Sequence, residues 1–235
     1  MKELQIKVEL QEFLGSDKSV ADAAWTSSLD YQKKETRTEG DVKRVVQMLA
    51  DSKHSVPFES VVFRFWMRIP VATDRQIMTH RIASHSGMSG RYRTMPGDFL
   101  KMPQDVADII KIVEEVEPAL AECFTNDYED ICKEANAAYQ NTVIYFRDLK
   151  NKEIITNDQY KRIREFYRGM LPQHNMTERV TIINLRSWCN FYRLRSKADA
   201  QPEIREVAQL MLSEIEKANV APIAIECLKK NDWNI

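Results

Sequence analysis

The stretch Ser60–Ile69, with the sequence SVVFRFWMRI, decides the fold class of this protein. From Val61 onward, apolar residues occupy every second position, and the positions between them include two arginines. Alternation of this kind predicts a β-strand with one buried face. Pro70 follows directly and ends the strand, so the chain contains at least one half-buried sheet strand.

The segments outside this strand are predicted to be mostly helical. Only 6 glycines and 8 prolines interrupt the 235 residues, so long helices should dominate a single α+β domain over residues 1–235. Helical spacing is found in these segments: Ser19–Ser27, Thr38–Ser52, a helix from about Thr73, two helices between Asp105 and Lys150 that break near Thr125 and Asn126, Asn157–Met170, a helix from Asn184, Glu203–Lys217 and Val220–Lys230. Further strands are predicted over Leu4–Leu14 and Met176–Ile183, and Ser84–Pro103 is predicted to be irregular.

Two of these helices are expected to group polar residues. Gln76 and His80 lie four positions apart in the helix from Thr73, so they should share a helical face. In the helix from Asn184, an apolar stripe leaves Arg186, Asn190 and Arg193 together on another face. The stripe consists of Leu185, Trp188, Cys189 and Tyr192.

The charge balance and the cysteine spacing restrict the classes of function. The chain has 34 basic and 35 acidic residues, which argues against a nucleic-acid-binding protein. The N-terminus, MKELQIKVEL, has no apolar signal core, and no eighteen apolar residues run together, so we expect a soluble, cytoplasmic protein without a membrane segment. The 4 cysteines lack metal-ligand spacing, so neither disulfides nor a metal site is expected.

Glycine is concentrated between Gly87 and Gly97, where three of the 6 glycines fall. In this segment Gly87 and Gly90 flank Ser89, and Arg91 follows. Such a loop brings backbone N–H groups, a hydroxyl and a guanidinium close to an anion, and a nucleotide phosphate would fit it. An ordinary surface turn is the alternative interpretation.

Arginine is concentrated in the second half of the chain. Arg168 precedes Leu171-Pro172, and Arg186, Arg193 and Arg195 lie within one short segment. The planar fork of donors in arginine suits a phosphate or the carbonyl edge of a pyrimidine. A solvated or ion-paired helix face is the alternative here.

Four blocks of sequence resemble the flavin-dependent thymidylate synthase family. Thr79-His80-Arg81-Ile82-Ala83-Ser84-His85-Ser86-Gly87-Met88-Ser89-Gly90-Arg91-Tyr92 is similar to the family signature, an R-H-R triplet, seven residues, a serine and a nearby Arg-Tyr. His54-Ser55-Val56-Pro57-Phe58-Glu59 resembles the family's H-x-x-P-F-E segment. Downstream, Arg168–Pro172 and Asn184–Arg195 resemble the family's C-terminal blocks. Ser19–Ser28 resembles the family's N-terminal segment, so the likeness covers nearly the whole chain.

The resemblance implies a fold and an activity. The fold would be an α+β domain with a twisted, mainly antiparallel sheet flanked by long helices, assembled as a homotetramer with active sites shared between subunits. The activity would be reductive methylation of dUMP to dTMP, with FAD as cofactor and with methylenetetrahydrofolate and NADPH as co-substrates. No metal would be needed.

The resemblance also implies roles for individual residues. FAD would be held by His80, Arg81, Asn184, Arg186 and Asn190, with a backbone contact from Leu185, and His54 would lie beside the flavin and the folate. The residues that would bind dUMP are Gln76, Ser89, Gly90, Arg91 and Arg168. Arg195 would face the uracil ring and stabilise negative charge there. Arg195 and Ser89 are thus the predicted catalytic residues, with Ser89 as a substrate contact rather than a nucleophile, because no base is paired with it.

Three departures from the common pattern leave alternatives open. Thr79 stands in place of an arginine, Ser86-Gly87 in place of Asn-Glu, and Asp199 in place of a histidine. One alternative is therefore a flavin-dependent C5-methylase of UMP or another pyrimidine nucleotide. A second, from a different class, is a non-catalytic nucleotide- or RNA-binding module that uses the arginines and the Ser89 loop.

Overall fold

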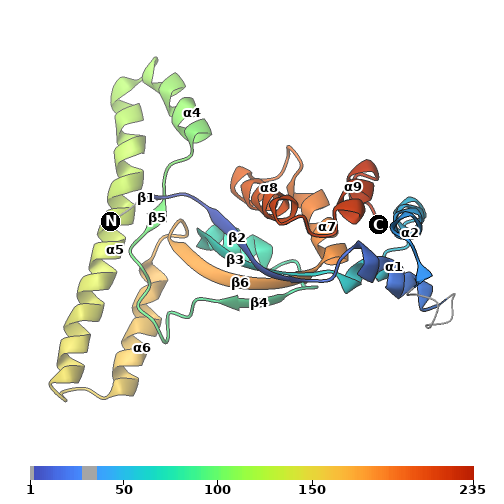
Figure 1. Cartoon of the computed structure of the whole chain (residues 1–235). Coiled ribbons are helices and arrows are strands. Elements are labelled where there is room, and N and C mark those ends of the chain that lie inside the picture. The colour runs from blue at the N-terminus through green and yellow to red at the C-terminus, as the bar shows by residue number, and fades with distance from the viewer. Residues whose placement is uncertain (1–2, 28–35) are drawn as a thin grey trace. The chain divides into compact units, whose positions relative to one another are not determined.

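A computed structural model describes residues 3–27 and 36–235, so Ser28 of the family-like N-terminal segment lies outside the described residues. Its α+β fold contains, within these residues, nine α-helices and a four-stranded, mostly antiparallel sheet in the order β2-β3-β6-β4 (Figure 1). The strands are β1 (Glu3–Leu4), β2 (Lys7–Leu14), β3 (Val62–Pro70), β4 (Ser84–Gly87), β5 (Phe99–Leu100) and β6 (Met176–Asn184). Strands β1 and β5 form a separate parallel pair.

The helices account for most of the described chain, as predicted. They are α1 (Asp17–Trp25), α2 (Glu39–Asp51), α3 (Val71–Ile77), α4 (Gln104–Glu114), α5 (Pro118–Asn151), α6 (Asn157–Tyr167), α7 (Leu185–Arg195), α8 (Pro202–Lys217) and α9 (Pro222–Lys230), with 3-10 turns at Val56–Ser60 and Arg168–Met170. None of the helices in the described residues is long and apolar enough to cross a membrane.

The chain contains two compact units, each interrupted in sequence. The first is formed by Met1–Gln5, Arg68–Asp74 and Gly87–Glu178, and the second by Ile6–Met67, Arg75–Ser86 and Arg179–Ile235. In the first unit, α4 and α6 pack against the long helix α5 (Figure 1). In the second, α8 packs against β2 and α7 packs against α8.

The predicted strand at Ser60–Ile69 is confirmed as β3, and it organises the core of the second unit. Phe63, Phe65 and Met67 are fully buried, whereas the residues between them are half-exposed. The ring of Phe63 meets the ring of Trp188 edge-on at a centroid distance of 6.2 Å. Burial of aromatic side chains contributes strongly to core stability, so this contact fixes the inner face of α7.

The predicted apolar stripe of α7 is also confirmed. Leu185, Trp188 and Cys189 are buried, while Arg186 and Asn190 are exposed on the opposite side. The backbone N–H of Leu185 donates to the carbonyl of Val61 at 2.8 Å, which ties the first turn of α7 to the start of β3. The helix therefore presents its polar face outward from a fixed position.

The predicted helix break near Thr125 and Asn126 is wrong, because α5 is continuous through both residues. The interruption lies instead between Glu114 and Pro118. Proline is tolerated in the first turn of a helix, where its missing N–H would have no intrahelical partner. Thr125 lies inside this helix, and its hydroxyl finds a partner without breaking it, since it donates back to the carbonyl of Ala121 at 3.4 Å.

The shared helical face predicted for Gln76 and His80 is wrong, because α3 ends at Ile77. The backbone N–H groups of Thr79 and His80 donate to the carbonyls of Gln76 and Ile77, at 3.2 and 3.0 Å. These i→i+3 bonds close the helix with a tight turn, so His80 lies in the loop that follows.

The prediction that Ser84–Pro103 is irregular is wrong in part. The segment contains β4, which pairs with β6 at the edge of the sheet, and the short strand β5. The sequence of β4, Ser-His-Ser-Gly, has no apolar alternation, so only its pairing with β6 defines it as a strand. The predicted strand Leu4–Leu14 is likewise divided, into β1 and β2.

A pair of asparagines supports the core of the first unit. Asn136 of α5 and Asn175 are buried, and each side-chain amide donates to the other's oxygen, at 3.2 and 2.7 Å. Asn136 also donates to the carbonyl of Cys132 at 2.8 Å. Both side chains are thus satisfied away from water, as buried polar groups must be.

Replacing Asn136 with alanine is expected to lower the free energy of unfolding by about 1 to 3 kcal/mol, because the buried amide of Asn175 then loses its partner. Chemical denaturation measures the change. Asn126→Ala is the matched control, since Asn126 is exposed on the same helix, and it should shift stability by less than about 0.5 kcal/mol. Equal losses for the two variants would contradict the role of the pair.

Candidate functional site

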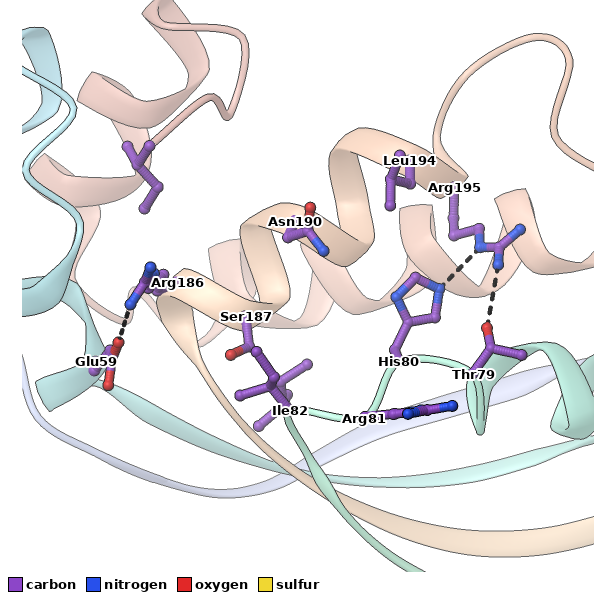
Figure 2. Close-up of a pocket in the computed structure, with 12 residues that line it drawn as sticks. Glu59, Thr79, His80, Arg81, Ile82, Arg186, Ser187, Asn190, Leu194 and Arg195 are labelled. Atoms are coloured by element: carbon purple, nitrogen blue, oxygen red, sulfur yellow. Dashed lines mark hydrogen bonds and ion pairs between the residues drawn. The ribbon is translucent and has the colours of Figure 1, made fainter.

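A pocket of about 730 Å³ lies in the second unit, bordered by the polar face of α7 and the loop after α3 (Figure 2). Its volume falls within the range of about 300 to 1,000 Å³ that is typical of small-molecule and cofactor sites. The pocket is lined by Glu59, Thr79, His80, Arg81, Ile82, Ile183, Arg186, Ser187, Asn190, Leu194, Arg195 and Ile235. Five predicted site residues, His80, Arg81, Arg186, Asn190 and Arg195, are therefore brought together.

The guanidinium of Arg195 contacts two consecutive residues of the loop after α3 (Figure 2). Its Nε–H donates to Nε2 of His80 at 3.0 Å, and Nη2 lies 3.5 Å from Oγ1 of Thr79. Arg195 is the last residue of α7, so its contacts join the end of this helix to the loop. The orientation of the Arg195 guanidinium in the pocket is thus set by His80 and Thr79.

His80 is neutral at physiological pH. Burial, the nearby charge of Arg195 and the neighbouring His85 lower the pKa of His80 to about 4. The ring of Phe191 packs edge-on against the imidazole at a centroid distance of 4.9 Å. Because Nε2 accepts from Arg195, the single ring proton is assigned to Nδ1.

The first turn of α7 forms another wall of the pocket. Asn184 caps this helix by accepting from the backbone N–H of Ser187 at 2.8 Å. Arg186 pairs with Glu59 at 2.5 Å, and both side chains are partly exposed (Figure 2). The N-terminal end of a helix carries partial positive charge, whereas the charge of Arg186 is offset by the Glu59 carboxylate beside it.

Asn184 and Leu185, both predicted to contact the flavin, have clear structural roles. Asn184 is the N-cap of α7, and Leu185 is buried with its N–H bonded to Val61. Neither residue is among those that line the pocket. The sequence placed them correctly at the start of a helix, and they position the pocket-lining residues that follow.

The predicted phosphate loop lies in the first unit, where the structure brings Gly90 and Arg168 together. A Cβ atom at Gly90 would lie 2.7 Å from Cδ and 3.2 Å from Nη1 of Arg168, so any larger residue here would require the Arg168 side chain to shift. Ser89 comes directly before Gly90. The Arg168 side chain therefore lies against the backbone next to Ser89, although Arg168 is far from the loop in sequence.

The backbone of this loop is partly occupied by its own turn. The N–H groups of Tyr92 and Arg93 donate to the carbonyl of Ser89 at 3.2 and 3.1 Å, and the N–H of Arg91 points to the Ser89 hydroxyl at 3.3 Å. The Arg91 side chain pairs with Glu165 at 2.5 Å. The amides of residues 91 to 93 and the Arg91 side chain therefore already have partners within the protein.

His54 and Gln76 have different surroundings. His54 is exposed just after α2, where its N–H donates to the carbonyl of Leu49 at 2.9 Å and closes the end of that helix. The side-chain amide of Gln76 donates to Gln201 at 2.5 Å. Neither residue lines the pocket of about 730 Å³.

Three polar pocket residues, Glu59, Thr79 and Ser187, were not among the predicted site residues. Glu59 ends the H-x-x-P-F-E block, and Thr79 occupies the first position of the signature triplet. Both residues therefore lie in blocks that resemble the family, and that resemblance could have indicated them. Ser187 follows Arg186 by one position in the first turn of α7. Apolar lining comes from Ile82, Ile183, Leu194 and Ile235, none of which was a predicted site residue.

The fold and the site together define a class: an α+β protein whose arginine-lined pocket and glycine-serine-arginine loop offer donors to anionic ligands. The chain belongs to the family described as thymidylate synthase complementing protein, which matches residues 9–223.

Two relatives illustrate the similarity. The chain is 30% identical over 225 residues to the flavin-dependent thymidylate synthase of Treponema pallidum (strain Nichols), covering 96% of this chain and 69% of that protein. It is also 30% identical over 225 residues to the flavin-dependent thymidylate synthase of Kosmotoga olearia, covering 93% of this chain and 88% of that protein.

The fold is shared with a solved structure of a UMP/dUMP methylase, PolB from Streptomyces cacaoi. The form bound with 5-Br UMP has a TM-score of 0.70, and the form bound with 5-Br dUMP has a TM-score of 0.68. Each comparison covers 97% of this chain and 96% of that chain, at 23% identity. The similarity therefore concerns the architecture.

Proposed function

We propose that this protein is a flavin-dependent thymidylate synthase, which methylates dUMP to dTMP with methylenetetrahydrofolate as carbon donor and NADPH as reductant. The observation that carries the proposal is the gathering of His80, Arg81, Arg186, Asn190 and Arg195 around one pocket, in a chain that belongs to this family. The two relatives named above carry the same activity in their names.

The residues of the pocket fit FAD. Arg81 and the N-terminal end of α7 supply positive charge for a pyrophosphate, and Arg186 adds further N–H donors beside its ion pair with Glu59. Ile82 and Leu194 present exposed apolar surface, 76% and 43% accessible, that a flat ring system would cover. Asn190 adds an amide for the polar edge of such a ring. When bound there, the flavin supplies the reducing equivalents that complete the methyl group.

Arg195 is the residue that we assign to the uracil ring. C5 of uracil is a poor nucleophile until negative charge builds on the ring and its carbonyl oxygens. A fixed guanidinium stabilises such charge because it is already oriented when the charge develops. This assignment requires no cysteine, in accord with the burial of Cys189, whose thiol pKa is raised by that burial.

We assign the phosphate of dUMP to the Ser89 loop, with Gly90, Arg91 and Arg168, and a further substrate contact to Gln76. The close approach of Arg168 to Gly90 supports this assignment. His54 is assigned a place beside the flavin and the folate. We also propose a homotetramer whose active sites are shared between subunits, as in the family that the sequence resembles.

Two measurements on the purified protein test the proposed function. The visible absorption spectrum, with and without added FAD, should show a bound flavin. Release of tritium from C5-labelled dUMP should require both methylenetetrahydrofolate and NADPH. Release from labelled UMP alone would contradict dUMP as the substrate and favour a different pyrimidine methylase. A protein that cannot take up FAD would instead be a nucleotide-binding module.

A further inference from the structure

The hydroxyl of Thr79 has a defined hydrogen-bond direction. Its Oγ1 lies 2.7 Å from the backbone carbonyl of Gln76, which can only accept, so the Thr79 hydroxyl donates its single proton there. The same oxygen faces Nη2 of Arg195 at 3.5 Å. Its lone pair is therefore directed to the guanidinium, and Thr79 accepts from Arg195.

The imidazole of His80 offers the second acceptor. It is neutral, and its Nε2 receives the Nε–H of Arg195 at 3.0 Å. The ring packs edge-on against Phe191, and the backbone carbonyl of His80 lies 3.3 Å from Nε2 of His85. A protonated imidazole would have no acceptor left for Arg195.

These two contacts use two of the five N–H donors of a guanidinium. Within the described residues, two N–H groups on Nη1 and one on Nη2 take no part in these contacts and can donate to a ligand. A side chain fixed at both Nε and Nη2 has lost most of its freedom before a ligand arrives, and such preorganisation raises affinity by lowering the entropy lost on binding.

We propose that Thr79 and His80 are a positioning pair, which holds the guanidinium of Arg195 in the direction that the pyrimidine ring requires. The inference rests on the proposed function, because it assigns Arg195 to that ring. It also gives a reason for the threonine in the signature triplet of this chain. The arginine common at this position has no acceptor, so it could not make the contact that Thr79 makes.

Thr79→Val and Thr79→Ser form a matched pair of variants. Valine keeps the shape of threonine without the hydroxyl, and serine keeps the hydroxyl. Calorimetry on the FAD-loaded protein measures the Kd for dUMP. We expect Thr79→Val to raise this Kd by about 3- to 10-fold, the range that corresponds to one hydrogen bond, and Thr79→Ser to stay within about 2-fold of the parent protein.

The second readout is the pKa of His80, from NMR titration of histidine-labelled protein without nucleotide. Arg195 helps to keep this pKa low, so a loosened Arg195 in Thr79→Val should raise it, while Thr79→Ser should leave it unchanged. This readout does not depend on any methylation of dUMP, so a failure of the proposed function is distinguishable from a failure of the pair. If Thr79→Val matched the parent protein in both readouts, the inference would be overturned.

Discussion

Replacement of Arg195 with glutamine is expected to lower kcat for dUMP methylation by about 100- to 1,000-fold, the usual effect of removing a donor aimed at developing charge. Glutamine retains one amide donor but loses the positive charge and the fork of N–H groups. The two contacts to His80 and Thr79 are lost with the guanidinium. Single-turnover measurements of dTMP formation on FAD-loaded protein would isolate the step that the charge assists.

The control for this variant is Lys197→Gln, which removes one positive charge from an exposed position two residues later in the chain. Lys197 is not among the residues that line the pocket. We expect kcat of this variant to remain within about 2-fold of the parent protein, as is usual for surface substitutions. Equal rates for Arg195→Gln and the parent protein would show that Arg195 does not face the reacting ring.

Replacement of Arg168 with alanine is expected to weaken dUMP binding by about 10- to 100-fold, since a hydrogen bond to a charged group contributes about 1.5 to 3 kcal/mol. The reason lies in the contact of Arg168 with Gly90, which places the guanidinium at the Ser89 loop. The Kd for dUMP, measured by calorimetry at constant ionic strength, is the appropriate readout, because phosphate contacts are sensitive to salt.

Deoxyuridine, which lacks the phosphate, separates this role from general damage to the site. Arg168→Ala should bind deoxyuridine with the same Kd as the parent protein. The ratio of the Kd for deoxyuridine to the Kd for dUMP should therefore be smaller in the variant. Lys161→Ala is the control for charge, because Lys161 lies on α6 and pairs with Asp158. Loss of affinity for nucleoside and nucleotide alike would count against a phosphate role for Arg168.

Local sequence patterns predicted the fold well where one face of an element is buried. The alternation around Phe63 defined β3, and the stripe of Leu185, Trp188 and Cys189 defined α7, because burial selects side chains at the period of the element. The patterns failed where burial does not decide the structure. β4 is polar throughout, and its strand conformation depends on pairing with β6.

The end of α3 illustrates a failure with a direct consequence for the site. Spacing alone put Gln76 and His80 on one helical face, but the i→i+3 bonds after Ile77 turn the chain. His80 thereby meets Arg195, which is 115 positions away in sequence. No local pattern contains that contact, since it depends on where the end of α7 lies in the folded second unit.

The residue types of the candidate site were determined by the sequence itself: the arginines, the histidine and the glycine-serine loop stand in blocks that identify the family. Only the tertiary structure decided which of these residues share a pocket. It also decided that Asn184 and Leu185 support the start of α7, and that Thr79 accepts a hydrogen bond from Arg195. The physical reason is that residue type and helical period are local properties of a chain. The direction of a guanidinium and the pKa of an imidazole depend instead on burial and on neighbours that only folding brings within reach.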